Sequence, residues 1–479
     1  MIAMTLAEIA EALGGRLHAA DPDALVTRPL EFDSRHCEPG GLFLALTGEH
    51  VDGHDFVDTA IANGAVAAIV TREVDAACIV VADGLAALAT LATVVSRRLQ
   101  ARIVGITGSS GKTSTKDLVA QLLSRLGPTV APPGSFNNEL GHPYTVLLAD
   151  EQTRFLVLEN SARGIGHIRY LTGIARPGIA VELNVGSAHL GEFGSRQAIA
   201  QAKGELVEAL PAAADGGVAI LNADDPFVAA MAERTAARVV TYGESNDVDV
   251  RADHVVLDDL GRAAFMLNYA QQSAPVVLRL VGGHHVGNAL AAAAVALECG
   301  MPFPAVAEAL SEARAISRWR MELTERDDGV LIINDAYNAN PESMRAALKA
   351  LASVARARRA TGGRSFAVLG PMAELGADGP AEHDAIGRLA VRLDVSQLIA
   401  VGEQARPIQH GAALEGSWDG ESRWVPDVAA AIALLRELLR PGDVVLVKAS
   451  RAASLERVAL AIAEDATGLP TSDGEEGTA

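Results

Sequence analysis

Residues 105–115 read GITGSSGKTST, which has the composition of a phosphate-binding loop. The usual template, Gly-x-x-x-x-Gly-Lys-Ser/Thr, fails because Ile106 occupies the position of its first glycine. An apolar strand precedes the glycines and a helix follows them, an arrangement that points backbone N–H groups at a phosphate. We therefore predict a shorter nucleotide loop, in which Lys112 reaches the β- and γ-phosphates of ATP and the Thr113 hydroxyl binds Mg²⁺. The predicted nucleotide-binding residues of this loop are Gly108, Ser109, Ser110, Gly111, Lys112, Thr113 and Ser114.

Two more candidate residues follow strand patterns. Glu159 ends the apolar run FLVLE, and His189 follows the run GIAVELNV at 178–185 by four residues. Ligands of an open α/β sheet bind beyond the carboxyl ends of the strands, so both side chains are expected on the same rim as the loop. Glu159 is a candidate Mg²⁺ ligand, because this ion prefers oxygen donors and needs few from the protein; the alternative is a solvated cap. His189 is a candidate catalytic residue, and the alternative is a structural histidine.

A mostly parallel sheet is needed to bring these residues together. Apolar strand runs alternate with helical patterns in this part of the chain, which indicates βαβ crossovers. The runs are 102–107, 154–159, 178–185 and 217–222. The helix from Lys112 has apolar residues on one face and ends at Gly127 and Pro128. Residues 247–281 resemble an antiparallel appendage, and a helix at 287–300 closes this block.

Two further blocks flank this one. The first opens with a helix in which Thr5 and Glu8 have capping-box spacing and Gly14 marks the end. Its strand runs are 41–46, 65–70 and 77–81. The last block begins near Arg318, and its strand runs are 329–335, 364–370, 396–402 and 442–450. We predict an α/β protein of three domains with a disordered acidic tail. The predicted bounds are 1–100, 101–316 and 317–470 for the domains and 471–479 for the tail.

Composition excludes several classes of protein. A formal net charge of −20 over 479 residues argues against non-specific nucleic-acid binding, and it requires local amides, Arg and Lys to hold any anionic substrate. The three cysteines are far apart, so no disulfide framework or zinc site is predicted. No apolar run approaches the roughly 20 residues that span a bilayer, and the amino terminus lacks the basic start of a secretory signal. We expect a cytoplasmic, monomeric enzyme without membrane insertion.

A series of ordered motifs between about residues 28 and 460 resembles the Mur ligases, which build the peptide stem of bacterial cell-wall precursors. The motifs include GITGSSGKTSTK, SFNNELGHPYTVLL, LNVGSAHLGEFGS, AKGEL, RWRME, NDAYNANPESM, LGPMAELG and VLVKASR. The resemblance implies a small α/β uridine-binding domain, a central ATPase-like parallel sheet and a Rossmann-like carboxy-terminal domain. It also implies that ATP phosphorylates a carboxylate to an acyl phosphate, which an amine then attacks.

Within the family, NNELGHPYTVL, NDAYNANPESM and GPMAELG look like motifs of the last-acting member. The implied substrates are UDP-N-acetylmuramoyl-tripeptide and D-alanyl-D-alanine. The alternatives are a sibling ligase that adds diaminopimelate or lysine, a folylpolyglutamate-type ligase, a P-loop NTPase and a catalytically weakened homologue. The stretch DSRHCEPGGLFLALTGEHVDGHD at 33–55, which the resemblance assigns to the uridine-binding domain, disfavours the folate enzyme, because folate ligases lack that domain. The absence of a Walker B aspartate after a hydrophobic run disfavours the NTPase.

The resemblance also assigns residues to the substrates. It implies two Mg²⁺ ions, one held by Thr113 and Glu159 and the other by His189 and a carbamylated Lys203. The implied ATP contacts outside the loop are Asn288, Arg320 and Asp335. The implied contacts of the uridine end are Ser34, Arg35, Thr47, Asp52 and His54, and those of the muramoyl and diphosphate part are Asn137 and Asn138. Two other candidate substrate contacts are Ser161, in ENSARG where the family has small apolar residues, and Asn338, in NANPESM.

Overall fold

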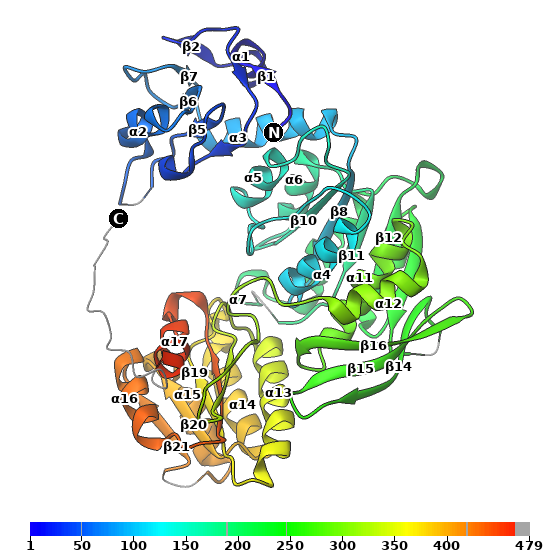
Figure 1. Cartoon of the computed structure of the whole chain (residues 1–479), viewed down its shortest axis with the longest axis vertical. Helices are drawn as coiled ribbons and strands as arrows, with labels where there is room; N and C mark the ends of the chain where they lie inside the picture. Colours follow the sequence, from blue (N-terminus) through cyan, green and yellow to red (C-terminus); the bar gives the residue numbers. More distant parts are fainter. Residues whose placement is uncertain (49, 188–189, 246, 418–419, 465–479) are drawn as a thin grey trace.

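The structure is a computed structural model, and it describes residues 1–48, 50–187, 190–245, 247–417 and 420–464 of the chain. Three α/β units follow one another in sequence, each built on its own main sheet. The central unit lies between the N-terminal unit, blue in Figure 1, and the C-terminal unit, yellow to red. This arrangement confirms the predicted α/β fold.

The N-terminal unit is built on a five-stranded sheet in the order β2-β7-β6-β5-β4, in which β2 and β7 are antiparallel and the other neighbours parallel. The bounds are β2 Arg16–His18, β4 Leu30–Glu31, β5 Leu42–Leu44, β6 Ala67–Val70 and β7 Cys78–Val80. Helix α1 (Leu6–Leu13) starts at the predicted capping box of Thr5 and Glu8 and ends at Gly14.

The N-terminal and central units share one hydrophobic core. Helix α3 (Gly84–Arg98) supplies Leu88 and Val95 to a buried cluster that also contains Leu156 of the central sheet and Val146 of α5 (Gly141–Leu147). Because apolar side chains of both units are removed from water together, this contact fixes the orientation of the first unit.

The central sheet has nine strands in the order β16-β15-β14-β13-β12-β11-β8-β10-β9. Neighbours from β9 to β14 are parallel, and β14 to β16 form the predicted antiparallel appendage. The bounds are β8 Arg102–Thr107, β9 Thr129–Val130, β10 Phe155–Glu159, β11 Ile179–Glu182, β12 Val218–Asn222, β13 Arg238–Gly243, β14 Val250–Leu257, β15 Arg262–Tyr269 and β16 Gln272–Val281. Because β8 lies between β10 and β11, Glu159 is in register with Ile106, and Glu182 with Thr107.

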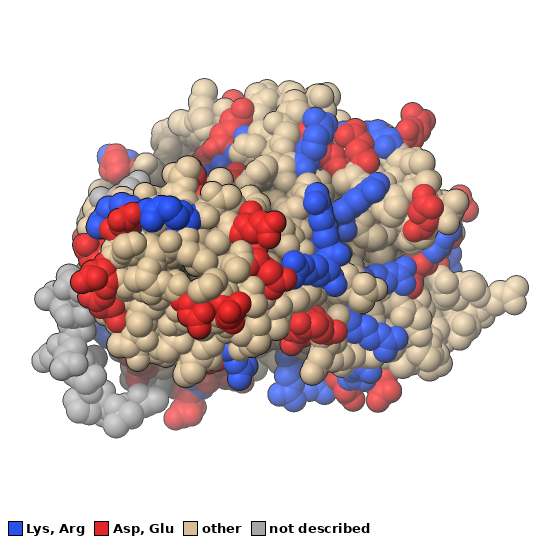
Figure 2. All heavy atoms as spheres, turned by 90° about the horizontal axis from the view of Figure 1, so that it is seen from above, with Lys and Arg blue, Asp and Glu red and all other residues tan. Residues whose placement is uncertain are grey.

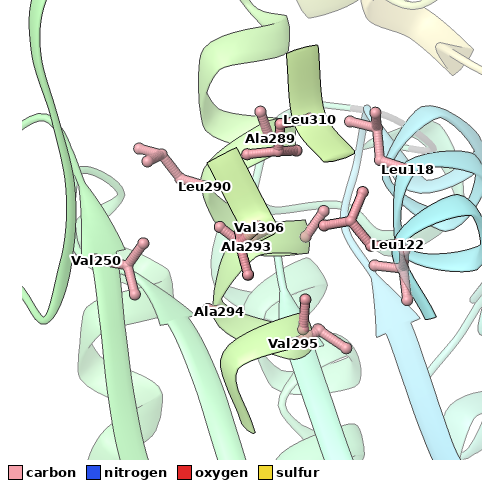
Figure 3. Close-up of a cluster of buried hydrophobic side chains, with 14 of the residues drawn as sticks. Leu118, Leu122, Val250, Ala289, Leu290, Ala293, Ala294, Val295, Val306 and Leu310 are labelled. Carbon is pink, nitrogen blue, oxygen red and sulfur yellow. The ribbon is translucent and has the colours of Figure 1, made fainter. Parts of the chain in front are cut away.

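Helices cover both faces of the central sheet. One face packs against α4 (Lys112–Ser124), α11 (His285–Glu298) and α12 (Phe303–Glu312). Figure 3 shows Ala289 and Ala293 of α11 beside Leu118 and Leu122 of α4. The small alanine side chains allow α11 to pack close to the helix that follows the phosphate loop. The other face packs against α6 (His167–Ile174), α8 (Arg196–Lys203) and α9 (Glu205–Glu208).

The C-terminal unit is built on a six-stranded sheet in the order β17-β18-β22-β19-β20-β21, parallel except for the β17–β18 pair. The strand bounds are β17 Glu322–Glu325, β18 Leu331–Asn334, β19 Ser365–Leu369, β20 Gln397–Val401, β21 Ser422–Val425 and β22 Val444–Lys448. The helix bounds are α13 Pro341–Arg359, α14 Gly379–Arg392, α15 Arg406–Leu414, α16 Val428–Leu438 and α17 Glu456–Glu464.

A topological switch point lies between β19 and β22. The chain leaves β19 for α14, which packs on one face of the sheet, and leaves β22 for α17, which packs on the other. The loops after two such strands diverge, and the crevice between them is the usual ligand site of an open α/β sheet.

Some elements differ from the sequence prediction. Strands β13 and β21 were not predicted, nor was the short helix α10 (Pro226–Ala229), which Asp225 caps. The predicted tail at 471–479 lies outside the described residues. Within the described residues, no helix is long and apolar enough to cross a bilayer. Acidic and basic side chains are interspersed on the face shown in Figure 2.

Candidate functional site

The predicted phosphate loop joins β8 to α4. Gly111 begins the helix with φ 83°, and a Cβ atom there would lie 2.6 Å from Asn288 Oδ1, so only glycine lets the loop pass this close to α11. The contact places Asn288, the predicted adenine contact, against the loop. Lys112 Nζ donates a hydrogen bond to the Gly108 carbonyl at 2.7 Å. Burial lowers the pKa of Lys112 to about 8, although the nearby Glu159 carboxylate opposes this shift.

Thr113 and Glu159 meet at the ends of neighbouring elements. Glu159 is fully buried, and its Oε2 lies 3.4 Å from Thr113 Oγ1 and 3.2 Å from Asn137 Nδ2. Its other oxygen, Oε1, has no hydrogen-bond partner in the described part of the chain. Burial raises the pKa of Glu159, while Lys116 and Lys112 oppose the shift. A buried carboxylate beside a hydroxyl, with one oxygen left over, fits the hard oxygen donors that Mg²⁺ prefers.

A second buried charged group lies beneath the end of β11. Lys203, the last residue of α8, is 4% exposed, and burial lowers its pKa to about 7. Glu182, at the end of β11, is fully buried, and both of its carboxylate oxygens lack partners among the described residues. Burial raises the pKa of Glu182 to about 8, and Lys203 is the charge that most opposes this. An amine with a pKa near 7 is partly neutral at physiological pH, which is the form that adds CO₂.

Sequence reasoning did not select Glu182. The available signal was a single glutamate inside the otherwise apolar run GIAVELNV. His189, predicted to act with Lys203, lies outside the described residues. Across the residues that the structure describes, no group of three or more His, Cys, Asp and Glu side chains has the arrangement of a metal site.

Two further predicted ATP contacts are Arg320, in the segment that leads into the C-terminal unit, and Asp335, which follows β18. Arg320 Nη2 lies 3.3 Å from Thr113 Oγ1 and 3.1 Å from Ser135 Oγ, and its guanidinium carbon lies 4.3 Å from the ring centroid of Tyr337. Asp335 is buried and accepts a hydrogen bond from Lys448 Nζ at 2.6 Å. Arg320 therefore lies directly at the phosphate loop, whereas Asp335 is occupied by a lysine of the neighbouring strand.

A cavity of about 430 Å³ lies between the two units. One wall comes from the phosphate loop and the segments after β9 and β10, and the other from the loops after β18, β19 and β22. Its lining contains several predicted residues, namely Ser109, Ser110, Gly111, Lys112, Thr113, Ser114, Asn137, Asn138, Ser161, Arg320 and Asn338. Ser161 Oγ donates to the Asn137 carbonyl at 2.8 Å, so this serine fixes the asparagine loop. The neighbouring Asn160 is buried against β8 and does not line the cavity.

The predicted uridine contacts belong to the N-terminal unit and do not line this cavity. Thr47 and Asp52 form an isolated β-bridge. His54 is buried, with Nδ1 2.6 Å from Asp52 Oδ1 and Nε2 accepting the Thr71 amide at 3.0 Å. Both ring nitrogens are therefore engaged, and His54 holds this loop in place.

Ser34 and Arg35 lie in the loop after β4. Ser34 is buried, and its carbonyl accepts a hydrogen bond from Asn63 Nδ2 at 2.8 Å. The exposed Arg35 guanidinium pairs with Asp33 at 2.7 Å, and this contact lowers the pKa of Asp33 to about 2. The arginine is thus held at the surface of the N-terminal unit by a carboxylate.

Comparisons with known proteins agree with this arrangement of units. The chain matches the profiles for the Mur ligase family catalytic domain at 29–101, the Mur ligase middle domain at 106–296 and the Mur ligase glutamate ligase domain at 319–451. A relative from Mycobacterium tuberculosis named UDP-N-acetylmuramoyl-tripeptide--D-alanyl-D-alanine ligase is 54% identical over 98% of this chain and 99% of its own. A relative of the same name from Escherichia coli is 35% identical over 98% of this chain and 100% of its own.

Two solved structures are also similar. MurF from Acinetobacter baumannii superposes with a TM-score of 0.84 and 34% identity, covering 96% of this chain and 99% of that one. The MurF ligase from Thermotoga maritima in complex with ADP gives a TM-score of 0.78 and 29% identity, covering 92% and 98%.

A phosphate loop that faces the strand ends of a second α/β unit defines the class of three-domain, nucleotide-using ligases. The chain belongs to the Mur ligase family, whose members form amide bonds at the expense of ATP.

Proposed function

We propose that the chain joins D-alanyl-D-alanine to UDP-N-acetylmuramoyl-tripeptide, forming UDP-N-acetylmuramoyl-pentapeptide, ADP and phosphate. Relatives that match nearly the whole chain carry the name of that ligase, and the similar Thermotoga maritima structure holds ADP. The observation that carries the proposal is the cavity of about 430 Å³ with one wall from each unit. There a carboxylate, the terminal phosphate of ATP and an amine could be held together and shielded from water.

The first step transfers a phosphoryl group to the carboxylate of the tripeptide, which brings two anions together. Lys112, Arg320 and the backbone amides at the start of α4 supply positive charge to the same space. Bound Mg²⁺ would supply further charge neutralisation at the phosphate oxygens. The amine then attacks the acyl phosphate carbonyl, and phosphate leaves from the tetrahedral intermediate.

The residues proposed to hold Mg²⁺ are Thr113 and Glu159 for one ion, and His189 and carbamylated Lys203 for the other. The first assignment is supported by Glu159 Oε1, which has no hydrogen-bond partner in the part of the chain that the structure describes. The lowered pKa of Lys203 supports the second, because CO₂ adds to a neutral amine with loss of one proton to give an anionic oxygen ligand. The proposed role of His189 as a ligand of the second Mg²⁺ ion is supported by the family resemblance alone.

The dipeptide is proposed to bind in the crevice between β19 and β22. There Arg451 pairs with Glu456 at 2.6 Å, and its guanidinium carbon lies 4.6 Å from the ring centroid of Trp319. Glu374 has φ 63°, a left-handed conformation that non-glycine residues adopt at a cost, and its carboxylate lies 3.4 Å from Arg163. Both residues line the cavity. We assign the dipeptide carboxylate to Arg451 and its ammonium group to Glu374.

The remaining sequence assignments stay proposals. Asn288 is proposed to contact adenine, and Asp335 to act on the nucleotide from beside Lys448. The N-terminal residues are proposed to hold the uridine end, with Arg35 and Thr47 as the exposed candidates. A monomeric state and a cytoplasmic location also remain predictions.

The proposed function is tested by phosphate release from ATP and Mg²⁺ with UDP-N-acetylmuramoyl-tripeptide, in the presence and absence of D-alanyl-D-alanine. We expect release that requires both substrates, together with a product heavier by the dipeptide. Release without either substrate would indicate an NTPase. Turnover only with a muramoyl dipeptide and a single amino acid would indicate a sibling ligase.

A further inference from the structure

Helix α13 of the C-terminal unit contacts the central unit through the second residue of the helix, Glu342. Its Oε1 accepts hydrogen bonds from the backbone amide of Ser187 at 2.8 Å and from the Ser187 hydroxyl at 2.9 Å. The two residues are 155 positions apart, so the contact exists only when the units are docked. Neither residue was selected by its sequence pattern.

The contact depends on a glycine in the partner segment. A Cβ atom on Gly186 would lie 2.5 Å from the Glu342 side chain, so a larger residue would push the carboxylate off the Ser187 amide. The same segment is tied to the phosphate loop, because the Gly186 amide donates to Ser109 Oγ at 2.9 Å. Asn340, which caps α13, donates to the Ser109 carbonyl at 3.1 Å.

These contacts form one chain of hydrogen bonds from the start of α13, through residues 184–187, to the phosphate loop. Asn184 closes it, since its Oδ1 accepts the Ser110 amide at 3.0 Å. The segment follows β11, whose last residue, Glu182, pairs with Thr107 at the start of the phosphate loop. A shift of residues 184–187 would therefore disturb Ser109 and Ser110, which line the cavity at the phosphate loop.

We propose that Glu342 is a positioning residue that couples docking of the C-terminal unit to the placement of residues 184–187 against the phosphate loop. This inference rests on the proposed function only for its kinetic consequence. A side-chain oxygen at this position suits the role because it accepts both hydrogen bonds from Ser187. Misplacement of active-site groups by about 1 Å can cost on the order of 10²-fold in rate.

Three variants separate positioning from general stability. Glu342→Ala removes both hydrogen bonds, Glu342→Gln keeps an acceptor oxygen, and Ser187→Ala removes the hydroxyl while keeping the amide. Glu342 and residues 184–187 line a second cavity between the units, of about 350 Å³. Glu382 lines this cavity too, but it pairs with Arg345 of its own unit at 2.7 Å, so Glu382→Ala is the matched control.

The first measurement is amide hydrogen exchange of peptides covering 184–187, with Mg²⁺ and a non-hydrolysable ATP analogue. We expect exchange at least about fivefold faster in Glu342→Ala than in the unmodified chain. Exchange in Glu342→Gln and Glu382→Ala is expected to stay unchanged. This measurement requires neither the tripeptide nor the dipeptide, so it holds even if the proposed substrates are wrong.

The second measurement is the ligase reaction. Glu342→Ala is expected to lower kcat about tenfold with little change in the KM values, and Glu342→Gln is expected to restore most of kcat. Unchanged exchange at 184–187 in Glu342→Ala would overturn the proposal, as would an equal loss of kcat in Glu342→Gln and Glu342→Ala. If Glu342→Ala fails to fold, Ser187→Ala replaces it. A kcat loss smaller than tenfold together with faster exchange at 184–187 would support the proposal. The absence of both effects would overturn it.

Discussion

The guanidinium of Arg320 lies 3.3 Å from the hydroxyl of Thr113, although 207 positions separate the two residues. Arg320 belongs to the segment that leads into the C-terminal unit, and Thr113 is in the first turn of the helix after the phosphate loop. The phosphate loop is therefore contacted by a residue from outside the central unit. Binding of ATP and docking of the C-terminal unit should consequently depend on each other.

Replacement of Arg320 by lysine should weaken this link. The Arg320 guanidinium contacts the Thr113 and Ser135 hydroxyls and lies over the Tyr337 ring. A lysine ammonium is a compact point charge and cannot make all three contacts at the same time. We expect Arg320→Lys to raise the KM for ATP and lower kcat, with a combined loss of about tenfold or more in kcat/KM. Steady-state phosphate release measures the KM for ATP and kcat, and the exposed Arg318→Lys serves as control. Equal kinetics in the two variants would contradict the assignment.

Replacement of Glu159 by glutamine should change the response to Mg²⁺. The amide keeps the shape of the side chain but removes the negative charge beside Thr113. We expect kcat/KM to fall by about 10² or more, and half-maximal activity to need more Mg²⁺. The thermal midpoint should change little, because the replaced carboxylate is buried and one of its oxygens has no hydrogen-bond partner among the described residues. A Mg²⁺ titration that overlays the unmodified enzyme would exclude Glu159 as a ligand.

Lys203 should form a carbamate that is visible without any substrate. Its pKa, lowered to about 7 by burial, leaves more neutral amine as the pH rises, so carbamate should increase between pH 6 and pH 8. Carbon-13 NMR of the protein in labelled bicarbonate would show a carbamate signal that is missing from Lys203→Arg. A signal of equal size in the variant would assign the carbamate elsewhere.

Arg451 should determine recognition of the dipeptide carboxylate. We expect Arg451→Ala to raise the KM for D-alanyl-D-alanine about tenfold or more, while the KM for ATP stays nearly constant. The unmodified enzyme should use D-alanyl-D-alanine amide poorly, and the variant should no longer distinguish the amide from the acid. Arg457→Ala, an exposed change on α17, serves as control. Retained discrimination in Arg451→Ala would place the carboxylate elsewhere.

His142 should make the chain sensitive to acid. It is fully buried on α5, its ring nitrogens have no partners among the described residues, and burial lowers its pKa to about 3. Below about pH 6.5 the unfolded chain binds a proton at this histidine that the folded chain does not, so stability is lost as the pH falls. We expect His142→Leu to reduce the stability lost between pH 7 and pH 5 by about 2 kcal/mol.

Urea unfolding at the two pH values tests this, with the exposed His410→Leu as the matched change. The difference between the two variants isolates the buried ring. A similar pH dependence in both variants would mean that His142 is protonated without unfolding.

The sequence by itself determined the elements whose signals are local. Glycine spacing before Lys112 identified the phosphate loop, short apolar runs located most strands, and the spacing of Thr5, Glu8 and Gly14 predicted α1. Ordered motifs along nearly the whole chain identified the family. All these signals depend on neighbours in the chain, which is why they could be read without coordinates.

Tertiary structure decided which distant residues share a site. Insertion of β22 between β18 and β19 creates the crevice that holds Arg451 and Glu374, and no local pattern specifies strand order. Burial alone distinguishes Lys203 from a surface lysine, and burial also shifts the pKa of Glu182. Docking of α13 brings Glu342 to Ser187 across 155 positions. Such contacts arise from the packing of whole units, so they cannot be predicted from the spacing of residues along the chain.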